Sequence, residues 1–425
     1  MQSNVIINEN VPSTIAGKAA FFLISATIIW TTLIYGTVHQ PILSLFYVVV
    51  GVILVLWAVD GYLTGVIRID RSMFQIPLAA AAVYGFLQVI PYGYHTLIGG
   101  VENIRKTISI DPFATKMAAA HILALLIFLF SALVFVDSKK RLSTLVRLVT
   151  IFGFVFAFYA ILQMVLSPKK IYGIYASEFA APFGSFVNRH NFAAYMEMTI
   201  ALPMGLLFSR AIEKDKRLLY ITALGLMGVA LLLSGSRGGL VSAVAAVGFL
   251  VLLAFGRSGK RKLLVRLGAT AVVIGAIVAG AVMMGDETSL TRIAETARTN
   301  DFTTNRIEIW SASLKMIGES PVFGVGLGAF GVAYSRFDRS NGLERVEQAH
   351  NDYLEVLADG GLVGALIGVL FVFFLFRSGL RAARSHDPLI RGAAIGALAG
   401  CFGLLVHSLF DFVLHTTAVA VLFIS

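Results

Sequence analysis

Charged side chains are scarce in this chain. Asp, Glu, Lys and Arg together make up 14% of its 425 residues, whereas soluble domains carry about a quarter. The composition is 57% hydrophobic, and few regions lack an apolar stretch long enough to cross a bilayer. Runs such as 118–136 show no alternation of polar and apolar residues, which excludes the pattern of a transmembrane β-barrel. The sequence therefore predicts an all-α, polytopic helical membrane protein.

Several signatures of other protein classes are also missing. Cys401 is the single cysteine, which excludes an internal disulfide and a cysteine-rich metal site. The sequence contains no P-loop, so it does not predict an ATPase. No Asp-x-Asp pair lies on a loop predicted to face outside, where it could hold a divalent cation, and no serine nucleophile motif is convincing. We therefore expect neither a cofactor nor a metal site.

Hydropathy predicts about twelve transmembrane helices, in one integrated membrane domain. Segment 1–285 would hold helices one to nine, segment 286–352 a long loop with short helices, and segment 353–425 helices ten to twelve. The polar start of the chain lacks the basic region and cleavage site of a signal peptide, so the first span should remain as an anchor. The predicted spans are 19–38, 42–64, 73–92, 117–136, 144–166, 186–208, 218–234, 238–256, 265–285, 353–376, 390–407 and 411–425.

The distribution of basic residues predicts the orientation of these spans. If the N-terminus is cytoplasmic, more than half of the 34 Lys and Arg residues fall on alternate short loops that face the cytoplasm. The net charge of +10 then reflects topology and contact with membrane phospholipids, and nucleic acid is not an expected partner. The loop 286–352 would face outside.

Arginines and histidines on the predicted outer loops are the first candidates for chemistry. Arg237 lies in the short, glycine-containing turn 234–239, where backbone can approach a ligand and a guanidinium can grip a phosphate. Its alternative role is contact with lipid headgroups. Arg306 opens the helical part of the outer loop, and its alternative is a solvated pair with Glu308. Arg189 and His190 precede the sixth span, where they could line a polar cavity or anchor the helix at the interface.

His350 stands where the outer loop enters the tenth span. Imidazole titrates near neutral pH and suits proton transfer, although many histidines at interfaces are plain anchors. Asn351 follows it directly, and Asp352, Glu355 and Asp359 lie on successive turns of the predicted helix, so that one of these acids could orient the imidazole. Further along, His407 and Asp411 are four residues apart. They could orient each other or a neighbouring residue, and a structural hydrogen bond between helices is the favoured role.

The motif His350-Asn351, nine residues, Gly361-x-x-Gly364 resembles the signature of O-antigen ligases. The turn 234–239 and the order Arg306, Pro321, Gly324-Val325-Gly326 are similar to other landmarks of the same superfamily, over roughly residues 184–425. The resemblance implies a metal-independent, GT-C-type glycosyltransferase with its active site on the periplasmic side of the bacterial inner membrane. It would transfer a glycan from undecaprenyl pyrophosphate to a sugar hydroxyl of lipid A-core, with inversion.

The resemblance also assigns roles to residues. The functional histidine of the family maps onto His350 as the general base, and its functional arginines map onto Arg237 and Arg306 as ligands of the pyrophosphate. Arg189 is added from its position alone, and Asn351, Asp352, Glu355 and His190 are possible supporting residues.

Other functions fit the same sequence. An O-antigen polymerase or a protein O-oligosaccharyltransferase of the same superfamily would use the same chemistry on another acceptor. A secondary transporter is the alternative from a different class, since twelve spans suit one. A transporter should place its ionisable residues near the midplane of the membrane, whereas here Asp60 is the main acid inside a span and the motifs collect at one surface.

Overall fold

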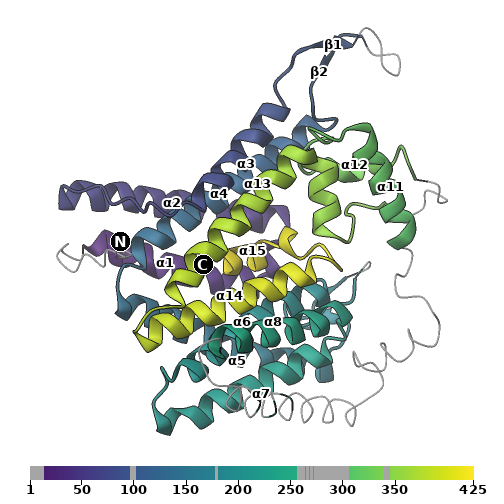
Figure 1. The fold of residues 1–425 in the computed structure, drawn as a ribbon. Coiled ribbons are helices and arrows are strands. Elements are labelled where there is room, and N and C mark those ends of the chain that lie inside the picture. Colours follow the sequence, from purple (N-terminus) through teal and green to yellow (C-terminus); the bar gives the residue numbers. More distant parts are fainter. Residues whose placement is uncertain are drawn as a thin grey trace.

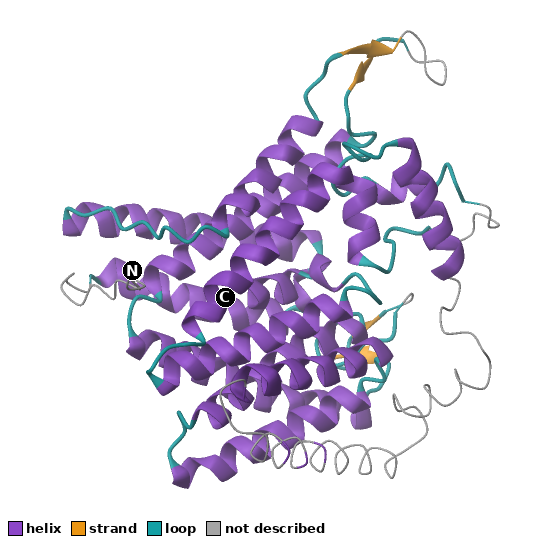
Figure 2. Ribbon diagram, in the orientation of Figure 1, coloured by secondary structure: helices purple, strands orange, loops and turns teal. Residues whose placement is uncertain are grey.

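The computed structural model describes residues 14–95, 102–177, 180–255, 306–338 and 345–425, together with Leu264, Gly268 and Ala271. This part of the chain is mostly helical, with two short antiparallel hairpins (Figures 1 and 2). The first half holds α1 (Ile15–Leu33), η1 (Tyr35–Thr37), α2 (Gln40–Thr64), α3 (Gln75–Gln88), β1 (Gly93–His95), β2 (Ile104–Lys106), α4 (Pro112–Phe135), α5 (Lys139–Leu166), β3 (Lys170–Ile171) and β4 (Tyr175–Ala176). The second half holds α6 (Arg189–Ser209), η2 (Lys214–Lys216), α7 (Arg217–Leu233), α8 (Arg237–Phe255), α11 (Arg306–Glu319), α12 (Phe330–Tyr334), α13 (Asp352–Ala382), α14 (Pro388–His407), η3 (Val413–His415) and α15 (Thr417–Ile424).

Nine helices of the described part are long and apolar enough to cross a membrane. They confirm the prediction of an all-α polytopic membrane protein. Three of the twelve predicted spans do not appear among these nine. The span 265–285 lies outside the described residues, apart from Gly268 and Ala271. The other two, 73–92 and 411–425, are corrected by the structure.

The span predicted at 73–92 is the 14-residue helix α3, which at 1.5 Å per residue is about 21 Å long and shorter than a hydrocarbon core. The span predicted at 411–425 contains only η3 and the eight-residue helix α15. Most side chains of α15 are buried in the bundle, including Val419 and Val421. The run 411–425 thus holds two short elements instead of the one continuous helix that hydropathy predicts.

Helix α6 is the central element of the bundle. Of its best 18-residue window 72% is buried, against 56% or less for the other eight candidate spans. It packs closely against α14 because both helices carry glycine at the contact. A Cβ added to Gly205 would lie 2.3 Å from the Gly392 oxygen, and one added to Gly396 would lie 2.6 Å from the Ala201 oxygen. Small residues of this kind let helix backbones approach in a membrane, and here they fix the helix that starts at Arg189 against the helix that ends at His407.

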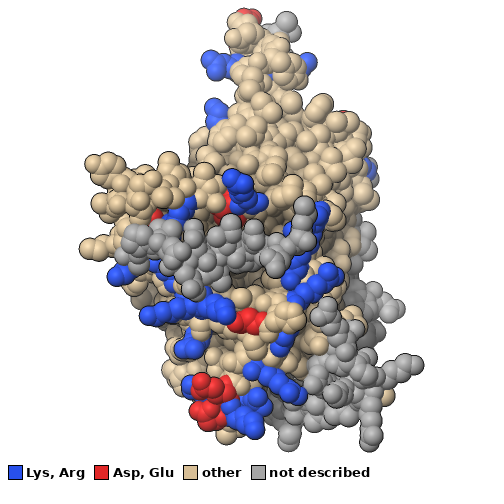
Figure 3. Space-filling view, turned by 60° about the vertical axis from the view of Figure 1, so that its left-hand side comes forward, with Lys and Arg blue, Asp and Glu red and all other residues tan. Residues whose placement is uncertain are grey.

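Basic side chains collect at one end of the bundle. Figure 3 shows lysines and arginines gathered on the face that lies at the left of Figure 1, away from α11 and α12. There Arg68 pairs with the buried Asp60 at 2.5 Å and with Asp137 at 2.9 Å, and Arg141 pairs with Asp137 at 3.1 Å. Asp60, the acid found inside a predicted span, is thus part of a network that ties α2 to the loop between α4 and α5.

Helix α13 is interrupted at Gly361, where φ is +60° and ψ is −159°. The loop before α12 docks into this break, because the Val325 amide donates to the Ala358 oxygen at 2.9 Å and the Leu362 amide donates to the Pro321 oxygen at 2.9 Å. Helix α3 closes the other side, where Gln88 donates to the Phe323 oxygen at 2.8 Å. The glycine motif after His350 therefore builds a junction between a broken helix and a loop.

Replacing Gly361 with alanine should destabilise the protein by about 3 kcal/mol or more, since this backbone conformation is essentially restricted to glycine. An added Cβ would also lie 2.4 Å from the Val322 oxygen. The measurement is the thermal midpoint of the purified protein in detergent. Gly368→Ala is the matched control, because a Cβ at Gly368 of the same helix meets nothing within 4 Å. Equal midpoints for the two variants would contradict this account of the junction.

Candidate functional site

Five separate segments meet at the end of the bundle opposite the basic face. They are the start of α6 with Arg189 and His190, the turn that leads into α8, the start of α11 with Arg306, the turn before α13 with His350, and the segment after α14 with Asp411. We call His190, Ser236, Arg306, His350 and Asp411 the Asp411 cluster. Its members come from distant parts of the sequence, so the fold alone brings them together.

Asp411 is the centre of this cluster. Its carboxylate lies 3.3 Å from His350 Nδ1, 3.6 Å from an Arg306 guanidinium nitrogen and 3.7 Å from His190 Nδ1. Its side chain is only 3% exposed. Burial on its own would raise the pKa of Asp411, but the hydrogen bond from His350 and the charges of His190, His350 and Arg306 hold this pKa below its ordinary value. Asp411 is therefore an ionised carboxylate at neutral pH, shared by three nitrogen groups.

His350 offers one ring nitrogen, Nδ1, to this carboxylate, and its other ring nitrogen has no hydrogen bond to any residue that the structure describes. Its side chain is 35% exposed, and its ring packs edge-on against Phe412 with centroids 4.9 Å apart. A carboxylate at Nδ1 favours the tautomer that carries the proton there, which leaves Nε2 with a lone pair. This arrangement is suited to accepting a proton from a hydroxyl group at Nε2.

The turn that carries His350 is strained and held from several sides. His350 has φ of +51°, which is uncommon for a residue with a side chain. Asn351 caps α13 by accepting from the amides of Tyr353 and Leu354, and it also donates to the Leu409 oxygen at 3.1 Å. The Ala349 oxygen accepts from Trp310 at 3.0 Å. The histidine is thus fixed by α11, by its own helix and by the segment that contains Asp411.

The arginines lie around the same cluster. Arg306 donates to the Phe410 oxygen in addition to its contact with Asp411. Arg237 is the first residue of α8, and its neighbour Ser236 has its hydroxyl 2.9 Å from His190 Nδ1. No ion pair joins Arg237 to another residue of the described part of the chain. A partly exposed guanidinium at a helix N-terminus is suited to an anionic ligand.

The sequence offers three acids that could orient His350, and the structure assigns other partners to all three. None of Asp352, Glu355 and Asp359 hydrogen-bonds the His350 ring, which pairs instead with Asp411. Asp352 and Glu355 both face His415, and Asp359 accepts from the Gly328 amide at 2.6 Å. The Asp411 and His407 side chains also have different partners, because His407 lies 3.4 Å from the buried Glu197.

Asp411 is the residue of the cluster whose role sequence reasoning missed. It lies 61 residues after His350, and the sequence favours a structural bond for it, with orientation of an unidentified neighbour as the alternative. The available signal is an acid just beyond the predicted span 390–407, on the side where the other motifs collect. That signal gives the side of the membrane, but it does not identify the partner.

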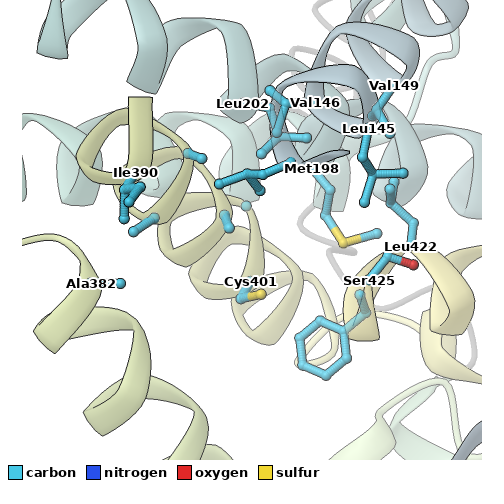
Figure 4. A pocket seen from close by; sticks show the side chains of 16 residues that line it. Leu145, Val146, Val149, Met198, Leu202, Ala382, Ile390, Cys401, Leu422 and Ser425 are labelled. Carbon is cyan, nitrogen blue, oxygen red and sulfur yellow. The ribbon is translucent and has the colours of Figure 1, made fainter. Parts of the chain in front are cut away.

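An apolar cavity of about 290 Å³ lies apart from this chemistry. It is lined by α5, α6, α14 and the end of α15, and Figure 4 shows Leu145, Met198, Cys401 and Leu422 around it. None of the Asp411 cluster lines it. In the described residues, no three His, Cys, Asp or Glu side chains are arranged as metal ligands either. The Asp411 cluster is thus the candidate site.

Replacing Asp411 with asparagine should lower kcat by about 10²- to 10⁴-fold, because a histidine base that loses its orienting carboxylate loses most of its general-base contribution. The amide keeps the shape of the side chain but removes the charge that His190, Arg306 and His350 share. The rate of the reaction proposed below, measured at saturating substrate, tests this expectation. Asp215→Asn, at an exposed site in η2, is the control. An unchanged kcat in Asp411→Asn would show that the imidazole does not depend on this carboxylate.

Part of the chain, which includes residues of the candidate site, matches a known protein family. Residues 222–369 match the model of the family described as O-Antigen ligase. The matched region contains Arg237, Arg306 and His350 and ends before Asp411. It supports membership of the O-antigen ligase superfamily, which the sequence motifs resemble. No match was found among curated proteins.

Proposed function

We propose that this member of the O-antigen ligase superfamily is a glycosyltransferase that joins an O-antigen glycan to lipid A-core. The donor would be the glycan linked to undecaprenyl pyrophosphate, and the acceptor a sugar hydroxyl of lipid A-core. The product is lipopolysaccharide. The observation that carries the proposal is the convergence of His350, Arg306 and the Arg237 turn around one buried carboxylate.

The reaction is a single displacement. His350 Nε2 takes the proton of the acceptor hydroxyl, whose oxygen forms a bond to the anomeric carbon of the donor sugar. The bond from that carbon to the pyrophosphate oxygen breaks, and undecaprenyl pyrophosphate leaves with the electron pair. Attack from the side opposite the leaving group inverts the anomeric centre. The proton on His350 then passes to water, because the side chain is partly exposed.

The arginines would bind the leaving group and stabilise its charge. Arg237 and Arg306 would hold the diphosphate and stabilise the charge that develops on it, so that a metal ion is not needed for this role. Arg189, at the first position of α6, would add positive charge on the same side. His190 contacts both Asp411 and Ser236, and so links the turn that carries Arg237 to the carboxylate that pairs with His350.

The distribution of charge supports a location in the bacterial inner membrane with the site in the periplasm. The basic face shown in Figure 3 would lie in the cytoplasm by the positive-inside rule. The Asp411 cluster lies at the other end of the helices, where it would meet a lipid-linked glycan and the membrane lipids on the periplasmic side.

The test is transfer in vitro by the purified protein in detergent, with a chelator present. Undecaprenyl-pyrophosphate-linked glycan is offered with lipid A-core, and in a separate reaction with a second lipid-linked glycan. Glycan on lipid A-core is the expected result. Elongated lipid-linked glycan alone would assign the chain as an O-antigen polymerase, and glycan transferred only to an added pilin-type protein would assign a protein O-oligosaccharyltransferase. Absence of any transfer in detergent, together with uptake of the lipid-linked glycan by vesicles reconstituted with the protein, would favour the transporter.

A further inference from the structure

A second titratable cluster lies beside the Asp411 cluster and has no role in the mechanism above. His415, in η3, has its Nδ1 3.3 Å from an Asp352 oxygen and its Nε2 2.9 Å from a Glu355 oxygen. Both acids sit in the first turn of α13, and both side chains are buried, at 7% and 4% exposed. One histidine therefore faces two buried carboxylates, one with each ring nitrogen.

This geometry favours a positively charged ring. A neutral imidazole has one N–H group, whereas an imidazolium presents an N–H to each carboxylate. The contact to Glu355 is the shorter of the two, and the Asp352 side-chain oxygens make no hydrogen bond to a described residue. Burial lowers the pKa of His415, but the nearby carboxylates of Glu355 and Asp352 raise it well above its ordinary value. The ion thus neutralises part of a charge that α13 would otherwise bury uncompensated.

The same carboxylates are connected to the general base. The second oxygen of Glu355 accepts from the Ala349 amide at 2.8 Å, and Ala349 is the residue that precedes His350. The Asp352 amide donates to the Ser408 oxygen at 2.9 Å, which ties the turn to the segment before Asp411. Phe412 packs edge-on against both histidine rings, with centroids 4.9 Å from His350 and 6.3 Å from His415.

We propose that His415 is a positioning residue for His350: its imidazolium holds Glu355 and Asp352 in place, and Glu355 in turn fixes the strained turn that presents the base. This inference rests on the proposed function, since it assigns His350 as the base. It concerns a histidine that does not touch the reacting atoms. The role depends on the two contacts to the carboxylates and on the bond from Ala349 to Glu355.

Without the cation, the first turn of α13 would carry Asp352 and Glu355 three residues apart, with Asp359 one turn further on. Like charges at these spacings repel each other. Glu355 would then move toward water or take up a proton, and the Ala349 amide would lose a fixed acceptor. His350, at φ of +51°, would lose one of the contacts that hold it in this conformation.

The experiment compares His415→Gln with wild type in the transfer assay. We expect kcat to fall about 10- to 100-fold, a part of the 10²- to 10⁴-fold that a general base contributes, with KM for the lipid-pyrophosphate donor changed less than about twofold. The donor is bound by the arginines, which this substitution does not touch. His386→Gln, at an exposed position between α13 and α14, is the matched control and should behave as wild type.

A second variant separates positioning from general loss of structure. His415→Gln with Asp352→Asn removes one buried charge together with its counter-ion, and it should recover at least about tenfold of the lost kcat. The thermal midpoint and the folded yield of each variant are measured alongside. Recovery of kcat in the double variant is the readout that a merely structural role would not produce.

Each other outcome overturns the inference. Wild-type kcat in His415→Gln, a raised KM with unchanged kcat, or a loss of activity that matches the loss of folded protein would each remove the positioning role. His350→Ala distinguishes failure of this inference from failure of the proposed function. If that variant is inactive while His415→Gln is fully active, the proposed function stands and the inference fails. If His350→Ala is active, the proposed function itself fails.

Discussion

His350→Ala should leave a folded, membrane-inserted protein whose kcat for glycan transfer is lower by about 10² to 10⁴-fold, the usual contribution of general acid–base catalysis. A sugar hydroxyl is a poor nucleophile, and this substitution removes the group placed to take its proton. The arginines remain, so KM for the donor should change little. The rate is measured with purified protein at saturating donor and acceptor.

The same variant should fail in cells. In a strain that lacks its own ligase, it should leave bare lipid A-core, while wild type restores full-length lipopolysaccharide. His386→Ala, on the exposed loop at the far end of α13, is the control for replacing a histidine. Full-length lipopolysaccharide from the His350→Ala strain would refute the assignment of the base.

Arg237→Ala should lower kcat/KM by about 10² to 10³-fold, the range found when one group that stabilises developing charge is removed. Among the described residues Arg237 has no ion-pair partner, so its charge is available to a ligand, whereas part of the charge of Arg306 is engaged by Asp411. Arg237→Lys should recover only part of the loss, because an ammonium cannot match the bidentate geometry of a guanidinium on a phosphate.

The control for Arg237 is Arg336→Ala. The Arg336 side chain is 64% exposed and pairs with Glu319 at 3.8 Å, so its loss should leave transfer unchanged. Binding of undecaprenyl pyrophosphate, measured directly, should weaken in Arg237→Ala and not in the control. Equal donor affinity and equal rate in Arg237→Ala and wild type would exclude this arginine from the site.

The long helices were the part of the fold that the sequence predicted well. Apolar runs of 18 residues or more have few other solutions in a protein with so little charge, and nine helices of the described part meet that description. The predicted span 73–92 differs because the helix α3 has only 14 residues. The predicted span 411–425 differs because it is divided into η3 and α15, and most side chains of α15 are buried. Hydropathy contains neither of these features.

The glycine motif shows what a spacing pattern conveys and what it leaves out. The sequence motif places Gly361 eleven residues after His350 and gives no structural role for it. The structure supplies the physical reason, since Gly361 interrupts α13 and admits the loop at Val322. A broken helix and a continuous one have the same hydropathy, and only the backbone conformation distinguishes them.

The basic residues of the candidate site could be predicted from the sequence, but their acidic partners could not. Arg237 stands out in a short turn that contains glycine, Arg306 at the start of the helical part of the outer loop, and His350 at the entry to the tenth span. Asp411 and His415 do not, since their roles depend on which helix ends meet. The structure pairs Asp411 with His350 across 61 residues and His415 with Glu355 across 60. Such pairings follow from the packing of α6, α13 and α14, which one sequence does not specify.

The central claim is that one lipid diphosphate binds between Arg237 and Arg306 with its sugar facing His350. A cryo-electron microscopy structure of the protein with undecaprenyl-pyrophosphate-linked glycan tests it directly. The account predicts the diphosphate at hydrogen-bonding distance from both guanidinium groups and the anomeric carbon on the side of His350 Nε2. A diphosphate bound elsewhere, for example among Arg68 and Arg141 at the basic face, would contradict it.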